Sequence, residues 1–194
     1  MRPTGPCAIV ITGTPGTGKT AVSKLLANQI GANYLSLTQL VIGKGLEAAI
    51  DRNRRTRVVD LERTRSFLRK LLSNGKFMTV VDTHVPDAVP RGHVRRVIVL
   101  RCHPRVLEAR LRRKGWRGCK VRENLLAEIL DSCYATAVDY HGARKTDQLD
   151  TSEASPSKCV SQAKRVLKKH STGKVRVDWI DVLNREHSLE KYLR

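Results

Sequence analysis

The chain is poor in aromatic residues, which make up only 4% of its 194 residues. A surface that binds nucleic acid by stacking bases on aromatic rings is therefore not expected. No stretch of about 18 apolar residues occurs, which excludes a transmembrane helix. The N-terminal segment also lacks the long apolar region and the cleavage site of a signal peptide. These absences favour a protein of the cytoplasm that does not enter a membrane.

Paired cysteines are absent as well. The five cysteines are widely spaced and form no Cys-x-x-Cys pair, so a zinc site is not expected. Cys7 and Cys102 lie within apolar runs, where a thiol packs as a small hydrophobic side chain. Unpaired cysteines in odd number are typical of a reducing, intracellular location.

Acidic residues are few, since 18 Asp and Glu stand against 37 Lys and Arg and leave a net charge of +19. The excess is concentrated between Arg91 and Arg122, where twelve basic residues accompany a single acid, Glu108. A field of this sign attracts phosphates, acidic proteins or nucleic acid. Two interpretations stay open: these residues contact the backbone phosphates of an RNA or ribonucleoprotein, or they form a solvated helix face.

Five short apolar runs alternate with amphipathic segments along the chain, whose length fits one domain or one domain with a short tail. This alternation is typical of a parallel sheet with helices on both faces, so the predicted fold class is α/β with five parallel strands. The expected strands are residues 8–12, 33–37, 77–82, 96–101 and 147–151. The expected helices are residues 20–30, 59–73, 104–113, 123–140 and 156–170, with a weakly helical stretch at 38–49 and a polar, Arg-rich loop at 51–57.

The strongest motif is GTPGTGKT at residues 13–20, which matches the phosphate-binding pattern G-x-x-x-x-G-K-[ST] and lies between an expected strand and an expected helix. Glycines such as Gly13, Gly16 and Gly18 let backbone N–H groups converge on a phosphate. The following helix points its positive end at the same place. Lys19 can reach the β- and γ-phosphates of ATP, and the Thr20 hydroxyl can ligate Mg²⁺. The alternative is a solvated Gly-rich turn.

A second motif, Asp82-Thr83-His84, directly follows an expected buried strand. An acid there lies at the carboxyl edge of the sheet, where Asp82 can contribute to the Mg²⁺ site. His84 can orient a water molecule or a phosphoryl acceptor. A capping role for Asp82 and a structural role for His84 are the alternatives.

A third motif is the basic segment from Arg112 to Lys120, which contains Gly115 and Gly118. Two glycines give mobility, and five cations are available to hold phosphates when a lid closes. The alternative is a solvated basic loop.

Together these motifs resemble the small adenylate-kinase-like ATPases of the coilin-interacting nuclear ATPase family, the type-six adenylate kinases, which include archaeal adenylate kinases. The likeness covers about residues 7–169 and depends on GTPGTGKT, on the DTH that follows the third strand, and on Lys114-Gly115-Trp116 followed by KVRENLLAEI.

The resemblance implies a P-loop NTPase of the nucleoside monophosphate kinase type over residues 1–170, with a monophosphate-binding arm at about 38–61 and a short lid at about 113–123. Residues 171–194 form a basic C-terminal extension with no assigned role. The catalytic residues carried over are Lys19, Asp82 and His84, the metal ligands are Thr20 and Asp82, and the ATP-binding residues are Gly13, Gly16, Gly18, Lys19, Thr20, Ala21 and Lys114.

Two positions depart from the family pattern. Lys114 stands where an arginine is usual, which keeps the charge but loses the bidentate fork that suits a phosphate. Gln39 stands where an acid is common. A monophosphate pocket is expected beside Asp60 and Gln39. The acceptor phosphate would be held by an arginine among Arg52, Arg54, Arg55 and Arg57.

The resemblance implies a broad-specificity nucleoside monophosphate (adenylate) kinase that transfers the terminal phosphate of ATP to AMP with Mg²⁺, and that also hydrolyses ATP. It further implies a role in small (30S) ribosomal subunit maturation and 16S rRNA processing, through transient contact with a small-subunit ribosomal protein and pre-ribosomal RNA. Two alternatives stay open: a P-loop kinase for another small metabolite such as shikimate, and a basic ribosome-associated nucleotide switch without kinase activity.

Overall fold

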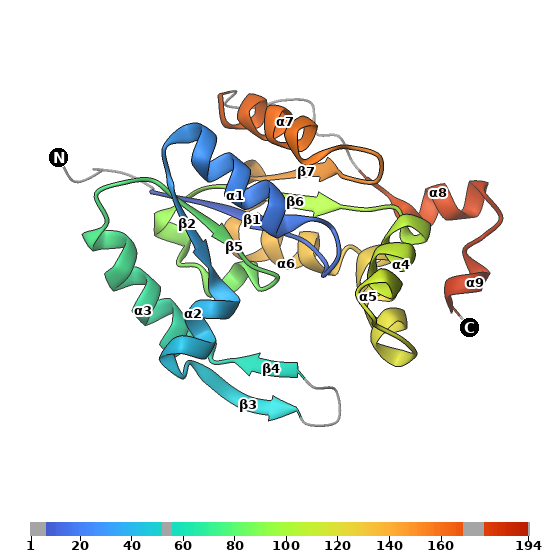
Figure 1. Ribbon diagram of the computed structural model, residues 1–194, viewed down its shortest axis with the longest axis horizontal. Helices are drawn as coiled ribbons and strands as arrows, with labels where there is room; N and C mark the ends of the chain where they lie inside the picture. The colour runs from blue at the N-terminus through green and yellow to red at the C-terminus, as the bar shows by residue number, and fades with distance from the viewer. Residues whose placement is uncertain (1–6, 52–55, 169–176, 194) are drawn as a thin grey trace.

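The computed structural model describes residues 7–51, 56–168 and 177–193. Its centre is a five-stranded parallel sheet in the order β2-β5-β1-β6-β7, as Figure 1 shows. The strands of this sheet are β1 (Ala8–Thr12), β2 (Asn33–Ser36), β5 (Thr79–Asp82), β6 (Val94–Arg101) and β7 (Thr146–Asp150). The predicted α/β fold class with five parallel strands is therefore confirmed.

Helices flank the sheet and extend beyond its carboxyl edge. They are α1 (Lys19–Ile30), α2 (Leu37–Lys44), α3 (Leu61–Asn74), α4 (Pro104–Arg113), α5 (Cys119–Ile129), α6 (Ser132–His141), α7 (Pro156–Lys168), α8 (Trp179–Arg185) and α9 (Glu190–Leu193). Short 3₁₀ helices span Pro86–Ala88, Arg91–His93 and Ala143–Lys145. No helix in the described part of the chain is both long and apolar enough to cross a membrane.

The core has three clusters, and two of them lie on opposite faces of the sheet because successive strand residues point to opposite sides. In β1, Ala8 and Val10 pack beneath α2, α3 and α6, whereas Ile9 and Ile11 pack beneath α1 and α7. A third cluster lies beyond the carboxyl ends of the strands, between α4, α5, α8 and α9. Cys7 and Cys102 are buried in this core, as predicted, and burial raises the pKa of Cys102 to about 12.

The chain visits the two sides of β1 in turn, going first to β2 and β5 and then to β6 and β7. Ligands in open α/β sheets bind where the strand order reverses in this way, outside the carboxyl ends of the strands. In this sheet that point is the carboxyl end of β1, directly before residues 13–20.

One predicted helix is interrupted. The single helix expected at 123–140 is wrong, because α5 ends at Ile129 and α6 begins at Ser132, with Asp131 between them in the left-handed conformation (φ 56°). The Asp131 carboxylate forms an ion pair with the buried Arg101. A tertiary contact therefore accompanies the break between α5 and α6, and the helical pattern of the sequence gives no sign of this break.

The expected helical stretch at 38–49 is only partly right. Helix α2 ends at Lys44, where Gly45 adopts the left-handed conformation (φ 60°) of a helix stop. The chain then forms an antiparallel hairpin of β3 (Glu47–Asp51) and β4 (Thr56–Val59), which stands apart from the main sheet in Figure 1. At the ends of the loop expected at 51–57, residue 51 belongs to β3 and residues 56–57 belong to β4, and residues 52–55 lie outside the described residues.

The segments proposed as lid and extension contain helices. Helix α5 already begins at Cys119, so only residues 114–118 of the proposed lid are irregular. Described residues of the C-terminal extension form α8 and α9, whose side chains Trp179, Leu183 and Tyr192 are buried. The boundary near residue 170 stays a prediction, but this segment packs against the domain rather than projecting from it.

Candidate active site

The turn of residues 13–20 depends on glycine. Gly13, Gly16 and Gly18 all have positive φ angles, of 137°, 99° and 96°. A Cβ atom on Gly13 would lie 2.3 Å from the carbonyl oxygen of Leu100 in β6. Only glycine fits so close an approach at this φ, and the turn can therefore curl against the sheet edge with its N–H groups directed to one side.

Lys19 lies at the start of α1, and its ammonium folds over this turn. The Nζ atom donates to the carbonyl oxygens of Gly13 at 2.8 Å and Thr14 at 3.1 Å. Burial lowers the pKa of Lys19, and the neighbouring Lys114 lowers it further, while Cys133 and Asp82 act in the opposite direction. The cation is thus positioned where a phosphate bound by the turn would lie.

Asp82 reaches the same turn because β5 lies beside β1, with Asp82 in register with Ile11. The Thr20 hydroxyl donates to Asp82 Oδ2 at 2.7 Å. The Tyr34 hydroxyl donates to the same oxygen at 3.2 Å. Asp82 is buried, whereas Thr20 is exposed. The two predicted metal ligands therefore meet at the edge of the turn.

This pair of oxygens fits Mg²⁺. The ion prefers oxygen ligands, keeps several waters, and is usually bound by one or two protein groups together with substrate phosphates. A hydroxyl and a carboxylate 2.7 Å apart beside a phosphate-binding turn supply that donor set.

His84 lies two residues beyond Asp82 at the rim of the same site, where it is exposed. Its pKa is lowered from the ordinary value of 6.5, first because the surrounding protein removes water from the ring and second because of the Lys19 ammonium. The imidazole is therefore neutral at neutral pH and can accept a proton.

Two cavities flank the turn. One, of about 700 Å³, contains the predicted residues Lys19, Thr20, Ala21, Asp82 and His84, together with Gln39 and Trp116. The other, of about 410 Å³, lies on the side of Arg110, Thr151 and Pro156. Gly16, Gly18 and Lys114 line both cavities. The two cavities therefore adjoin each other at the turn.

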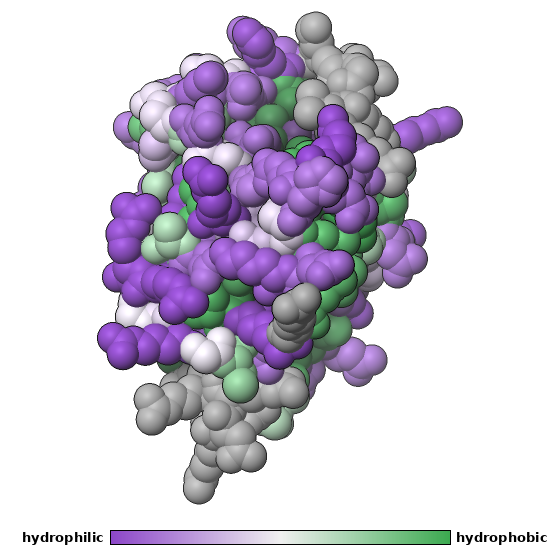
Figure 2. Space-filling model, turned by 90° about the vertical axis from the view of Figure 1, so that its right-hand side faces the viewer, coloured by the Kyte–Doolittle hydropathy of each residue, from purple (hydrophilic) through white to green (hydrophobic). Residues whose placement is uncertain are grey.

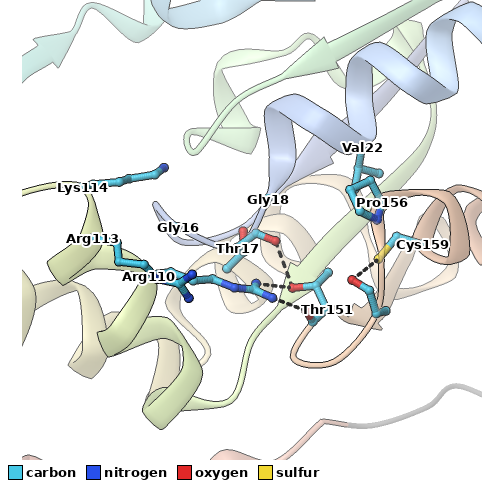
Figure 3. Close-up of a pocket in the computed structure, with 11 residues that line it drawn as sticks. Gly16, Thr17, Gly18, Val22, Arg110, Arg113, Lys114, Thr151, Pro156 and Cys159 are labelled. Atoms are coloured by element: carbon cyan, nitrogen blue, oxygen red, sulfur yellow. Dashed lines mark hydrogen bonds between the residues drawn. The ribbon is translucent and has the colours of Figure 1, made fainter.

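Arg110 and Thr151 shape the smaller of these cavities, as Figure 3 shows. Arg110 Nη2 donates to the carbonyl oxygens of Thr151 at 2.7 Å and Ser152 at 3.1 Å. The Thr151 hydroxyl donates to the Thr17 carbonyl at 2.9 Å. These bonds join α4, the loop after β7 and the phosphate turn, and so fix the walls of the cavity.

The larger cavity continues toward the arm at 38–61. A small adjoining pocket shares Thr38, Thr83 and His84 with it and is otherwise lined by apolar side chains. Those apolar residues are Leu37, Val41, Ile42, Val59 and Val85. Of the two residues expected beside a monophosphate pocket, Gln39 lines the large cavity, and Asp60 caps α3 by accepting from Arg63 N at 3.0 Å. The side chains of Arg52, Arg54, Arg55 and Arg57 lie outside the described residues.

Sequence reasoning missed four contributors. Tyr34 lies in an expected strand, and Arg110 and Thr151 belong to no recognised motif. Glu128 lies within an expected helix and was not singled out. Glu128 is nonetheless buried and accepts from the Thr14 hydroxyl at 2.6 Å, inside the phosphate turn. An acid on the apolar side of an otherwise amphipathic helix was the one available signal.

A family model described as "AAA domain" matches residues 9–131. "Putative adenylate kinase" from Pyrococcus abyssi (strain GE5 / Orsay) is 34% identical over 90% of this chain and 92% of its own length. The protein of the same name from Methanocaldococcus jannaschii is 31% identical over 89% of this chain and 93% of its own length.

Among solved structures, shikimate kinase from Acinetobacter baumannii in complex with shikimate superposes with a TM-score of 0.57 at 17% identity, covering 88% of this chain and 97% of that one. A gluconokinase from Sinorhizobium meliloti 1021 superposes with a TM-score of 0.54 at 18% identity, covering 87% and 94%. At this identity the likeness concerns the fold, which is that of P-loop kinases. By its sequence, the chain belongs to the archaeal family whose members carry the name "Putative adenylate kinase".

Proposed function

We propose that this protein is a nucleoside monophosphate kinase that transfers the terminal phosphoryl group of ATP to AMP. One observation carries the proposal: two cavities adjoin one glycine-rich turn and share Gly16, Gly18 and Lys114. A phosphoryl transferase needs this arrangement, because donor and acceptor must meet in line at the transferred group.

The donor nucleotide is assigned to the smaller cavity. Its adenosine would lie between Arg110 of α4 and the loop that carries Thr151 and Ala154, and its phosphates would pass over residues 13–20. Lys19 would neutralise charge on the transferred group, and Lys114, which lines both cavities directly after α4, would add a second positive charge. Thr20 and Asp82 would hold Mg²⁺, which when bound neutralises phosphate charge and aligns the phosphates for attack.

The acceptor is assigned to the larger cavity. Polar groups of Ser36, Thr38 and Gln39 line this cavity beside the turn and can bond to an acceptor. The larger cavity, of about 700 Å³, has room for a nucleoside monophosphate. His84, neutral at neutral pH, would orient the attacking oxygen.

A coupled assay tests this assignment. With Mg²⁺ and ATP, AMP should be converted to ADP, and other nucleoside monophosphates should be accepted more slowly. Shikimate and gluconate, tried in the same panel, should give background rates. Background turnover at saturating AMP while ATP still binds would contradict the kinase proposal.

A second candidate function is favoured by the distribution of charge. The basic side chains Arg105, Arg112, Arg113, Arg117 and Arg122 are exposed on or between α4 and α5. Figure 2 shows the face that contains these helices covered largely by hydrophilic side chains. Together with the net charge of +19, this surface supports contact with RNA phosphates near the nucleotide site.

In this second proposal the protein hydrolyses ATP during maturation of the small ribosomal subunit, in transient contact with a ribosomal protein and pre-ribosomal RNA. Hydrolysis should then occur without any monophosphate, and His84→Ala should reduce hydrolysis more than ATP binding. RNA binding should weaken steeply as salt rises. Undiminished hydrolysis in the variant would remove His84 from the hydrolytic mechanism.

A further inference from the structure

A buried carboxylate connects the phosphate turn to the C-terminal segment. Glu128 of α5 is only 2% exposed. Its Oε2 accepts from the hydroxyl of Thr14, in the phosphate turn, at 2.6 Å. Its Oε1 accepts from the indole Nε1 of Trp179, the first residue of α8, at 3.0 Å. Segments 114 and 51 residues away in the sequence therefore meet on one side chain.

The same carboxylate is held firmly in place by other donors. Arg101 Nε donates to Glu128 Oε1 at 2.8 Å, and the Cys102 N–H donates to that oxygen at 3.0 Å. Arg101, itself 2% exposed, also donates to Gln148 Oε1 at 2.7 Å and to the Val177 carbonyl at 3.4 Å. The end of β6, the end of β7 and the chain entering α8 thus fix the orientation of Glu128.

Burying such an ion pair is a weak way to gain stability. The cost of removing two charges from water often exceeds their attraction, and apolar residues of similar volume commonly serve the fold equally well. A fully bonded carboxylate between the phosphate turn and a distant segment is better explained by a requirement for position. The Thr14 carbonyl also accepts from Lys19 Nζ, so a phosphate that engages this ammonium acts on the residue that Glu128 holds.

We propose that Glu128 is a positioning residue that holds the phosphate turn through Thr14 and couples it to the C-terminal segment through Trp179. Packing of α8 then favours the turn conformation that binds nucleotide, and nucleotide binding changes the surroundings of Trp179. This inference rests on the proposed function, since it requires that residues 13–20 bind nucleotide phosphates.

Two conservative substitutions each remove one of the two hydrogen bonds that join Glu128 to Thr14 and to Trp179. Thr14→Val keeps the side-chain shape but removes the hydroxyl, and Trp179→Phe keeps an aromatic ring but removes the donor. Each should weaken binding of Mg²⁺ and a non-hydrolysable ATP analogue by about fivefold in calorimetry, a loss of about 1 kcal/mol that is typical of one hydrogen bond. Tyr192→Phe is the matched control, because Tyr192 is buried in the same segment and its ionisable neighbours are Lys191, Glu108 and Glu186 rather than Glu128. Nucleotide affinity should change by less than about twofold in this variant.

The double variant separates positioning from general stability. If both residues act through Glu128, Trp179→Phe should weaken binding little further once Thr14→Val has cut the connection. Fivefold losses that multiply to about twenty-five-fold, or a lower melting temperature with unchanged affinity in Trp179→Phe, would overturn the coupling.

Tryptophan emission supplies an independent readout. The chain has two tryptophans, Trp116 and Trp179, so Trp116→Phe leaves Trp179 as the only one. Because Trp116 lines the larger cavity, calorimetry of the Trp116→Phe variant first establishes the analogue concentration that saturates this background. The analogue should shift the emission of Trp179 in this background, and Thr14→Val should abolish the shift even at saturating analogue. An unchanged emission at saturation would contradict the coupling alone. Absence of nucleotide binding in the parent would instead contradict the proposed function.

Discussion

The environment of His84 predicts how the activity depends on pH. Its pKa lies below the ordinary 6.5 because of desolvation and the nearby Lys19 ammonium, despite the opposing charge of Asp82. The neutral form therefore predominates at pH 7, and the ring becomes half protonated only when the pH reaches the lowered value. If neutral His84 orients the attacking oxygen, kcat/KM should be constant near neutrality and fall on the acid side with a midpoint below 6.5.

A pH profile of kcat/KM between pH 5 and 8 checks this expectation. Substrate phosphates also titrate in this range, so His84→Asn, which cannot titrate, is the control. It should lower the rate and lose the part of the acid limb that belongs to the protein. An identical acid limb in parent and variant would show that His84 is not the titrating group.

Asp82 makes a second prediction at the level of single residues. If its carboxylate belongs to the Mg²⁺ site, Asp82→Asn should raise the Mg²⁺ concentration for half-maximal activity by about tenfold or more. Tyr34→Phe is the matched control, because it removes a hydrogen bond to the same Oδ2 atom but leaves the charge and the Thr20 contact. Magnesium titrations should show a much smaller change for this variant. Equal changes would indicate that Asp82 acts on the packing around Tyr34 rather than on the metal.

Among the structural elements, the glycine-rich turn at residues 13–20 predicts that glycine substitutions differ in how much they destabilise the fold. Gly18→Ala meets no atom within 4 Å and should cost only the strain of a positive φ, about 1–2 kcal/mol. Gly13→Ala adds a contact of 2.3 Å with the Leu100 backbone carbonyl, which cannot move without disturbing β6. It should lower the free energy of unfolding by more than about 3 kcal/mol.

Denaturant titration of the two variants measures this difference. Both carry the same chemical change in the same turn, and each serves as the control for the other. Equal losses of stability would mean that the turn can shift away from β6, and the close approach would then not be what requires glycine at position 13.

Much of the fold could be predicted because its determinants are local. The buried run Ala8–Thr12 is β1 itself, and Gly31 ends α1 as expected. The interruption between α5 and α6 could not be predicted, since no glycine or proline marks it and Asp131 is held by the distant Arg101. The hairpin of β3 and β4 was missed because its strands are short and Ala48, Ala49 and Val58 are exposed, so alternation carries little signal.

The candidate site likewise contains residues that could be predicted from the sequence and residues that could not. The turn at 13–20 and Asp82 could be expected to meet, because carboxyl ends of neighbouring parallel strands share one edge. The partners Glu128, Arg110 and Thr151 come from α5, α4 and the loop after β7, and their contacts arise only when those elements pack. Their sequence neighbourhoods contain no spacing rule that would bring them to the turn.

At the scale of the whole molecule, the nucleotide site lies where three packing clusters meet. The two clusters on the faces of the sheet hold β1 and α1, and the third joins α4 and α5 to the C-terminal helices. A Cβ atom on Gly16 would lie 2.7 Å from Leu107 Cδ1 and 3.0 Å from Leu111 Cδ2, and both leucines belong to the third cluster. The phosphate turn therefore packs directly on the cluster that the C-terminal segment completes.

This arrangement predicts that the C-terminal segment is part of the folded unit. Leu183 on α8 is completely buried in the third cluster, whereas Ile180 on the same helix is 40% exposed. Leu183→Ala should lower the free energy of unfolding by about 2–5 kcal/mol through lost burial and a cavity, and Ile180→Ala by less than about 1 kcal/mol. Denaturant titration of both variants gives the comparison, and a single transition in each would show that α8 unfolds together with the sheet. If Leu183→Ala instead produced a separate early transition with the main one unchanged, the segment would be an independent appendage, and its packing on α4 and α5 would not support the phosphate turn.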